Sequence, residues 1–476
     1  MLFHGVIVAL LGIRMTKAFE SSWTVACFWT NTFNSSDGAI ELCNHIIYEE
    51  PQVTLHDKTL TLKDDSDDSY KKKSGYKNVM KFRERHPQVK VELLIGQAQT
   101  KKVLYDIANN PEAFIKSSKD FLNNSGFDGI HLAWGSPAKD AHDYFLTSTK
   151  AMKQKKILTG FLKELKHANV SFSFGIHGVL EIDCNMEVEE VYALADLVFF
   201  YPYAYHGIWE ETTGAYSPIY PGEEGSERVN SYYMTVDSTW ESLEVWGGAP
   251  EKTVLVISAR GNAFNLTDPA QHDINAPNDR RGVTRNTQPV FKEVCRWQLD
   301  QEEPSWAKSP ANNWSLVWDD TRKQSYMYSG HVWLSYEDAC SVIEKKKYAI
   351  EMKFAGMALK DLSRDDLKGD CLRRTLPDHG GQMDDNLEGA FPLLRIIAEK
   401  KEQSNPCKTP DGKWVVGSVI LQDINVLFLF PIIPLTLRAP CSSLSNARSC
   451  TFAQIQIQVN NHQNHHRINH QNHQIG

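Results

Sequence analysis

The sequence predicts a (β/α)8 barrel, the TIM-barrel fold, with a small α+β insertion domain between its seventh and eighth strands. Short runs rich in β-branched and aromatic residues alternate with amphipathic segments, as expected for parallel strands joined by helices. The segment between the last two runs is much longer than a helical crossover needs. The eight expected strands are residues 24–30, 45–50, 89–96, 127–134, 170–178, 195–203, 251–259 and 354–362.

The barrel is divided by the insertion into two stretches of the chain. Strands one to seven occupy residues 21–266, and strand eight with the last helix occupies residues 351–404. Residues 76–88, YKNVMKFRERHPQ, are typical of a linking helix, because a basic amphipathic run stops at Pro87.

The insertion domain is expected at residues 267–350. Within it, SLVWDDTRKQSYMYSGHVWLSY (residues 315–336) alternates in the manner of an antiparallel meander, with a hairpin turn at Ser329–Gly330. The segment should form a small sheet beside the mouth of the barrel.

The N-terminal residues 1–20 indicate a secretory signal peptide. The apolar run Val6–Ile13 is too short to span a bilayer, and small residues near Ala18 offer a cleavage site; a buried or disordered N-terminus is the alternative. A secreted glycoprotein would carry sugar on its Asn-X-Ser/Thr triplets. These begin at Asn34, Asn123, Asn169, Asn265 and Asn313.

Composition and charge exclude several classes of partner. Apolar residues make up 41% of the chain and the net charge is -8, which gives no general attraction to nucleic acid or to an anionic membrane. No CxxC spacing indicates zinc, and no cofactor or metal is expected.

The tail, residues 405–476, should be disordered; its apolar run is too short and too rich in proline to span a membrane. Its clustered histidines are better explained as a polar low-complexity tract than as a metal site.

Motifs along most of the chain resemble glycoside hydrolase family 18, the chitinases and chitinase-like lectins. FDGIHLAWG at residues 127–135 is similar to that family's fourth-strand motif, Asp-Gly-x-Asp-x-Asp-x-Glu. The resemblance covers about residues 24–400. The other similar segments are CFWTN, LCNHIIY, YPYAYHGIWE, SPIYPG, GNAFNL, VWDDTRKQSYMYSGHVWLSYED and RDDLKGDC.

The resemblance implies a chemistry whose acids are missing here. In the family, the N-acetyl oxygen of the sugar attacks the anomeric carbon, and inward carboxylates on strand four protonate the leaving group and orient the substrate. Because strand residues alternate between faces, the inward positions of this chain hold His131, Ala133 and Gly135. Asp128 keeps the family's outermost aspartate. The chain is therefore expected to have no catalytic residue.

Other strand ends depart from the family in the same direction. Ala204 replaces an aspartate, Arg260 and Asn262 replace a tyrosine and an arginine, and Lys360 replaces the tryptophan beneath the central sugar. The tryptophans after strands one and three are also lost, at Thr32 and Ala98. The residues expected to contact a ligand are Phe28, Tyr203, Trp209, Arg260 and Lys360.

Each of these residues also has a structural explanation. His131 is best explained as a barrel-interior histidine bonded to a neighbour, and Asp128 as a structural hydrogen-bonding group. Lys360 is expected to pair with a carboxylate, because a lone buried ammonium is costly. Tyr203 and Trp209 could serve either ligand contact or packing.

The nine cysteines should be partly paired in an oxidising compartment. The resemblance implies disulfides Cys27–Cys43 and Cys295–Cys371. The other five cysteines have no assigned partner. They are Cys184, Cys340, Cys407, Cys441 and Cys450.

These features predict a secreted, non-hydrolytic chitinase-like protein. It would bind chitin-type oligomers or another oligosaccharide, with an anionic glycan or a protein receptor as further candidate partners, because Lys360 and Arg260 add positive charge at the mouth. One alternative is an active chitin or N-acetylhexosamine hydrolase that uses a displaced acid such as Glu181 or Asp183. Another is a relic barrel whose function lies on its outer surface.

Overall fold

The computed structural model describes residues 23–30, 38–49, 53–55, 62–64, 77–96, 106–133, 149–178, 186–223, 234–280, 288–300, 304–307, 313–367 and 392–399. All of these residues fall in one unit, Met1–Leu429, which is distinct from Phe430–Gly476. The predicted signal peptide (residues 1–20) and the predicted disordered tail (residues 405–476) lie outside the described residues.

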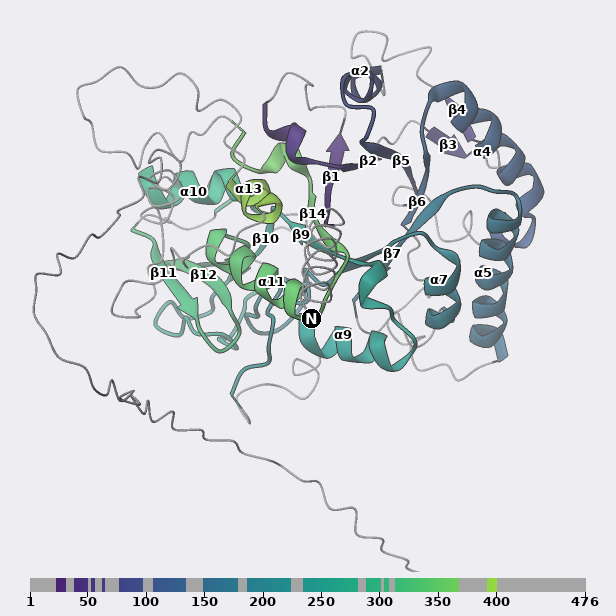
Figure 1. The fold of residues 1–476 in the computed structure, drawn as a ribbon. Coiled ribbons are helices and arrows are strands. Elements are labelled where there is room, and N and C mark those ends of the chain that lie inside the picture. The colour runs from purple at the N-terminus through teal and green to yellow at the C-terminus, as the bar shows by residue number, and fades with distance from the viewer. Residues whose placement is uncertain are drawn as a thin grey trace, which may run out of the picture. The chain divides into compact units, whose positions relative to one another are not determined.

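Eight parallel strands close into a barrel in the order β1-β14-β9-β8-β7-β6-β5-β2 (Figure 1). Each strand falls within one of the eight predicted runs, so the predicted fold class is confirmed. The barrel strands are β1 (Thr24–Thr30), β2 (His45–Glu49), β5 (Lys90–Ile95), β6 (Gly129–Ala133), β7 (Phe172–His177), β8 (Val198–Tyr201), β9 (Thr253–Ser258) and β14 (Gly356–Lys360).

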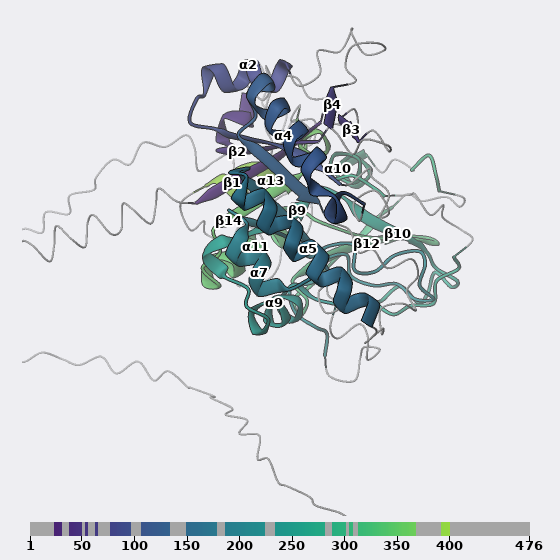
Figure 2. The same cartoon turned by 90° about the vertical axis from the view of Figure 1, so that its right-hand side faces the viewer.

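Helices α4 and α5 run along the outside of the barrel strands in both views (Figures 1 and 2). Helix α4 begins with Pro111, whose missing N–H suits a first helical turn, and is capped after Ser125 by Gly126, which has φ of 85°. The helices are α2 (Lys77–Arg85), α4 (Pro111–Ser125), α5 (Thr149–His167), α7 (Val188–Leu194), α9 (Val236–Val245), α10 (Phe291–Asp300), α11 (Ala339–Glu351) and α13 (Pro392–Ala398), with 3-10 turns η1 (Gly38–Leu42), η3 (Pro250–Lys252) and η4 (Leu362–Arg364).

The two faces of the barrel wall belong to two different buried clusters, one between the strands and the helices and one inside the barrel. Ile130 and Leu132 of β6 belong to the large cluster between strands and helices, whereas Ala133 belongs to the cluster inside the barrel. His131 also points inward, because its ring contacts Phe28 at a centroid distance of 5.8 Å. The alternation predicted for strand four is present over these residues.

The insertion between the seventh and eighth barrel strands is a sheet in the order β10-β13-β12-β11, as predicted in kind. The predicted hairpin is present, since β12 ends at Ser329 and pairs there with Val332, the first residue of β13. The sheet also takes in Gly261–Asn265, which precede the predicted boundary at residue 267. Its strands are β10 (Gly261–Asn265), β11 (Ser315–Asp319), β12 (Gln324–Ser329) and β13 (Val332–Tyr336); a separate hairpin pairs β3 (Val53–Leu55) with β4 (Leu62–Asp64).

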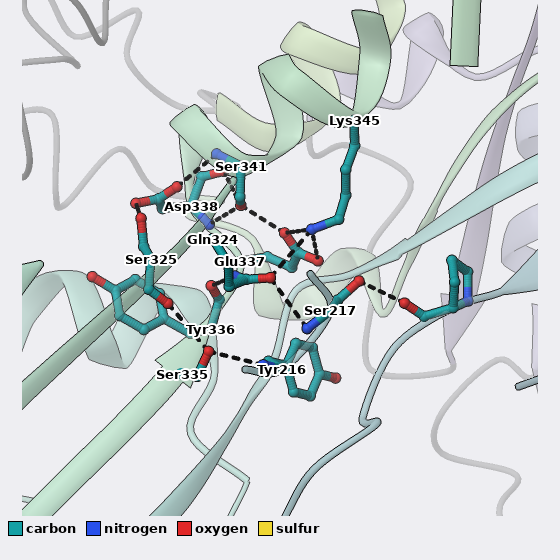
Figure 3. A network of polar contacts seen from close by, with 11 residues as sticks. Tyr216, Ser217, Gln324, Ser325, Ser335, Tyr336, Glu337, Asp338, Ser341 and Lys345 are labelled. Carbon is teal, nitrogen blue, oxygen red and sulfur yellow. Dashed lines mark hydrogen bonds and ion pairs between the residues drawn. The ribbon is translucent and has the colours of Figure 1, made fainter. Parts of the chain in front are cut away.

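A buried polar network connects the insertion sheet to the loop after β8 (Figure 3). Lys345 of α11 lies 2.8 Å from each carboxylate oxygen of Glu337, and both side chains are 0% exposed. Gln324 Oε1 accepts from Lys345 Nζ at 3.4 Å and from the backbone N–H of Ser217 at 3.1 Å. The backbone N–H of Tyr216 donates to Ser335 Oγ at 2.9 Å. The network thus fixes the loop that carries the sixth-strand site residues.

All four cysteines in the described part of the chain are disulfide-bonded. Cys27 and Cys43 are joined, with 6.0 Å between their Cα atoms, which confirms the first predicted pair. Cys295 is disulfide-bonded as well, and so is Cys340. Cys371, the predicted partner of Cys295, lies outside the described residues, so that pairing stays a prediction. The bond at Cys340 was not anticipated from the sequence.

Within the part of the chain that the structure describes, no helix combines the length and apolar character needed to cross a membrane.

Candidate functional site

The inward face of β6 carries a histidine and an alanine where the resemblance places carboxylates. His131 is fully buried, and its Nδ1 and Nε2 lie 2.7 Å from Ser173 Oγ and from Tyr201 OH. Ser173 of β7 in turn donates a short hydrogen bond to Glu92 Oε2. Four side chains from β5, β6, β7 and β8 therefore form one chain of hydrogen bonds across the barrel interior.

The direction of this chain follows from its end at Glu92. An ionised carboxylate only accepts, so Ser173 uses its proton on Glu92 and its oxygen must accept from His131 Nδ1–H. Burial lowers the pKa of His131 to about 3, so the ring is neutral and its Nε2 accepts the proton of Tyr201. In this series of three hydrogen bonds, each donor therefore points toward Glu92. His131 therefore has both nitrogens occupied and serves the structural role predicted as its simplest explanation.

Glu92 of β5 is a buried carboxylate that contacts His45 of β2, Lys90 of its own strand and Ser173 of β7. Burial alone would raise its pKa, but His45 at 3.2 Å and Lys90 at 2.8 Å lower it to about 2. The group is thus ionised and already paired. It cannot serve as a general acid near neutral pH.

Lys360 lies at the C-terminal end of β14, inside the barrel mouth. Its Nζ is 5.0 Å from the ring centroid of Phe28 and 5.5 Å from that of Tyr201, within cation–π range. It is also 3.8 Å from Glu49 Oε2 at the end of β2. Burial lowers the pKa of Lys360, while burial raises that of Glu49. The predicted carboxylate partner is therefore present.

Arg260 pairs with Asp361, the residue that follows Lys360. Its Nε donates to Asp361 Oδ2 at 2.6 Å, and Arg364 Nε donates to the same oxygen at 2.9 Å. Arg260 Nη1 reaches Gln288 Oε1 at 2.8 Å. Among the described residues of the mouth, two carboxylates thus offset the charge of the three cations. The positive charge expected from the sequence is largely balanced within the protein.

The predicted aromatic contacts differ greatly in accessibility. Trp209 is 46% exposed and its ring covers Gly207. Phe28 is 0% exposed and lies beneath Lys360, so its ring is not offered to a ligand at the surface. Tyr203 is partly buried and stacks on Tyr216 with centroids 6.2 Å apart. Trp209 is therefore the predicted aromatic that is freely accessible.

Asp128 has a structural role on the outer side of the barrel. One carboxylate oxygen accepts from Arg83 Nη2 at 2.6 Å and the other from the backbone N–H of Val91 at 2.8 Å. The side chain thereby ties β6 to α2 and β5. It does not reach the site.

Next to Tyr203, Ala204 has φ of 56°, the left-handed conformation that asparagine and aspartate tolerate better than alanine. Asn262, at the other replaced position, donates from its Nδ2 to the backbone carbonyl of His206 at 2.6 Å. Asn262 therefore holds the local backbone here, and Ala204 has no polar side-chain group to offer a ligand.

Several predicted residues lie outside the described part of the chain. These are Gly135, Thr32, Ala98, Glu181, Asp183 and the acceptor Asn34. Of the other glycosylation acceptors, Asn123, Asn169 and Asn313 are exposed and Asn265 is half-buried. No group of three or more described His, Cys, Asp or Glu side chains is arranged to hold a metal ion.

Sequence reasoning missed Glu49, Ser173 and Tyr201. All three occupy inward positions at alternating spacing in predicted strands, which is the signal that could have identified them. Glu49 is the described carboxylate nearest to Lys360 at the mouth. Because Glu49 belongs to the second barrel strand, inspection of the fourth strand alone does not reveal it.

Curated relatives of this chain are chitinases. The "Endochitinase" of Brugia malayi is 25% identical over 400 residues, covering 79% of this chain and 72% of that protein. "Chitotriosidase-1" of Mus musculus is 23% identical over 420 residues, covering 82% of this chain and 80% of that protein.

Solved structures show the same fold. The Ostrinia furnacalis group IV chitinase matches with a TM-score of 0.65 at 21% identity, covering 79% of this chain and 98% of that one. Human YKL-39, described as a pseudo-chitinase with retained chitooligosaccharide binding properties, matches with a TM-score of 0.62 at 20% identity and covers 79% and 98% of the two chains.

The family assignment rests on the sequence match, which runs through the whole barrel. Residues 24–365 match the family described as "Glycosyl hydrolases family 18", and this range holds all eight barrel strands and the insertion sheet. The match covers well over half of the chain. The chain therefore belongs to glycosyl hydrolases family 18.

Proposed function

We propose that this chain is a secreted chitinase-like protein that binds chitin-type oligosaccharides without hydrolysing them. The observation that carries this proposal is the inward face of β6, where His131 and Ala133 stand in place of carboxylates. The sequence continues the pattern with Gly135, which has no side chain.

The missing carboxylates bear directly on the reaction. Substrate-assisted cleavage needs one carboxylic acid to protonate the leaving oxygen and a neighbour to orient the N-acetyl group. His131 is neutral, buried and bonded through both nitrogens, so it has no proton to give to a substrate. Glu92 is ionised and lies beneath it. Neither group replaces the missing acid.

Binding is supported by what remains accessible at the mouth. Trp209 presents an exposed ring of the kind that stacks on sugar faces. YKL-39 shares the fold and is described as retaining chitooligosaccharide binding as a pseudo-chitinase. Secretion is supported by the Cys27–Cys43 disulfide, because such bonds persist in oxidising compartments, and by the signal-like residues 1–20.

A hydrolytic function is the second candidate, favoured by the names of the curated relatives and by Glu49. Burial raises the pKa of this carboxyl, as a general acid requires, and it lies at the mouth of the barrel. Against it, the described inward face of β6 offers no carboxylate beside it to orient the N-acetyl group. An anionic glycan, a protein receptor or a function on the outer surface becomes the explanation if neutral chitin oligomers do not bind.

We expect no turnover of a fluorogenic chitobioside above the buffer rate, because the position of the leaving-group acid is occupied by Gly135. The measurement is fluorescence release over several hours with the secreted chain, beside an active family member. Turnover that disappears in Glu49→Gln would instead establish the second candidate.

Replacing Trp209 by alanine should weaken the binding of chitotetraose by about two- to tenfold, because one stacked ring contributes roughly 0.5–1.5 kcal/mol beyond its burial. Isothermal titration calorimetry measures the change. Trp246→Ala is the matched control, since Trp246 is also exposed, at 39%, but lies at the end of α9. Equal losses in both variants would contradict a sugar site at Trp209.

A further inference from the structure

Lys360 combines features that a structural ion pair does not require. Its ammonium lies on the inside of the barrel at a strand's C-terminal end, where the ligands of this fold are bound. The aromatic rings of Phe28 and Tyr201 lie within 5.5 Å of Nζ. The residue as a whole is 7% exposed.

Its electrostatic surroundings favour an exchange of a proton with Glu49. Burial makes both charged forms costly, and it therefore lowers the pKa of the amine and raises the pKa of the carboxyl. The charges of Glu49 and Asp361 raise the pKa of Lys360 and that of Arg260 lowers it, but burial is the largest effect and the pKa is lowered overall. The distance of 3.8 Å from Nζ to Glu49 Oε2 lets a small movement of either flexible side chain complete a hydrogen bond. The fraction of neutral amine is thus larger than for an exposed lysine.

We propose that Lys360 is a nucleophile that captures an aldehyde as an imine, with Glu49 as the acid and base of the reaction. Lysines that act in this way are desolvated by an apolar site or placed beside another cation. Here the amine is buried over the rings of Phe28 and Tyr201, which meets the first condition. The aldehyde class includes the open-chain form of a reducing sugar. The inference goes beyond oligosaccharide binding and does not require a long sugar chain to occupy the mouth.

The step balances with the two side chains alone. Lys360 first gives a proton to the Glu49 carboxylate, and its nitrogen lone pair then forms a bond to the aldehyde carbon. A proton moves from nitrogen to the former carbonyl oxygen, which gives a carbinolamine. Glu49 protonates that hydroxyl group, water leaves, and the nitrogen lone pair forms the second C–N bond of a protonated imine. The net change is loss of one water molecule, with no oxidant or reductant.

The test traps the imine in the full-length chain with glycolaldehyde and cyanoborohydride, which reduces imines to stable amines. Peptide mass spectrometry then locates the adducts. We expect Lys360 to be labelled at least about tenfold faster than Lys163, an exposed lysine that also has a glutamate neighbour, Glu190 at 3.1 Å. In Lys360→Arg the fast adduct should disappear while the charge is kept, whereas Lys163→Arg should leave it unchanged.

Glu49→Gln tests the acid and base separately. It should slow labelling of Lys360 by about a hundredfold at neutral pH while leaving labelling of Lys163 unchanged. Circular dichroism checks that each variant is folded. Labelling spread over the exposed lysines, with Lys360 no faster than the rest, would overturn the proposal, and so would an unchanged rate in Glu49→Gln. Calorimetry with chitotetraose is run in parallel, so that a failure of sugar binding and a failure of imine capture are seen independently.

Discussion

Replacing Lys345 by methionine is expected to lower the free energy of unfolding by about 3–5 kcal/mol. The ammonium and the Glu337 carboxylate are both fully buried, 2.8 Å apart, and the substitution leaves Glu337 as a buried charge without its counter-ion. Gln324 also loses a donor. Unfolding in guanidinium chloride, followed by tryptophan fluorescence, measures the loss.

Two further variants show whether burial of the pair is the cause. Lys347→Met lies on the same helix and breaks an ion pair of similar length, 2.7 Å to Glu344, but this pair is partly exposed and should contribute less than about 1 kcal/mol. The double variant Lys345→Met with Glu337→Leu removes both charges and should recover much of the stability. If Lys347→Met were as costly as Lys345→Met, the effect would lie in the helix and not in the buried pair.

Replacing Glu92 by glutamine is expected to remove a pH-dependent contribution to stability of about 3 kcal/mol. The folded pKa of about 2 lies below the ordinary value of 4.5, so the folded chain binds fewer protons than the unfolded chain between these values. The contribution is fully present above pH 4.5 and is lost as the pH falls toward 2. Glutamine also leaves Lys90 without its counter-charge and removes the carboxylate oxygen that lies 3.2 Å from His45 Nε2.

The measurement is the unfolding midpoint from pH 7 to pH 2 for both proteins. The native chain should lose stability steeply below about pH 4.5, and Glu92→Gln should start lower and lose less over that range. Glu190→Gln, which breaks an exposed pair with Lys163, serves as the control and should follow the native curve. Parallel curves for the native chain and Glu92→Gln would show that the buried carboxylate does not carry this dependence.

The barrel could be predicted because its signal is local. Each strand is a short β-branched or aromatic run, and the two faces of β6 follow from the alternation of Ile130 and Leu132 with His131 and Ala133. The hairpin turn after Ser329 was likewise visible, because a glycine interrupts an alternating pattern. The extension of the insertion sheet to Gly261–Asn265 was not, because a strand's partner depends on tertiary pairing.

The contacts of the site could be predicted only in kind. A buried lysine must find a carboxylate, and this much was inferred for Lys360. Glu49 is this carboxylate because of the stagger between the strands, and that stagger cannot be derived from the sequence. The same holds for the partners of His131, since Ser173 and Tyr201 lie 42 and 70 residues away along the chain.

The single proton of Ser173 restricts how a carboxylate could be introduced on the inward face of β6. An aspartate at position 131 would need hydrogen-bond donors from the two neighbours that His131 now uses. Tyr201 could turn its proton to the new carboxylate, but the proton of Ser173 is already held by Glu92. Two buried carboxylates would then face one hydroxyl group, at a cost that neither alone incurs. An aspartate at position 131 would therefore be accommodated only after Glu92 had changed, so the order of the two substitutions would matter as well as their number.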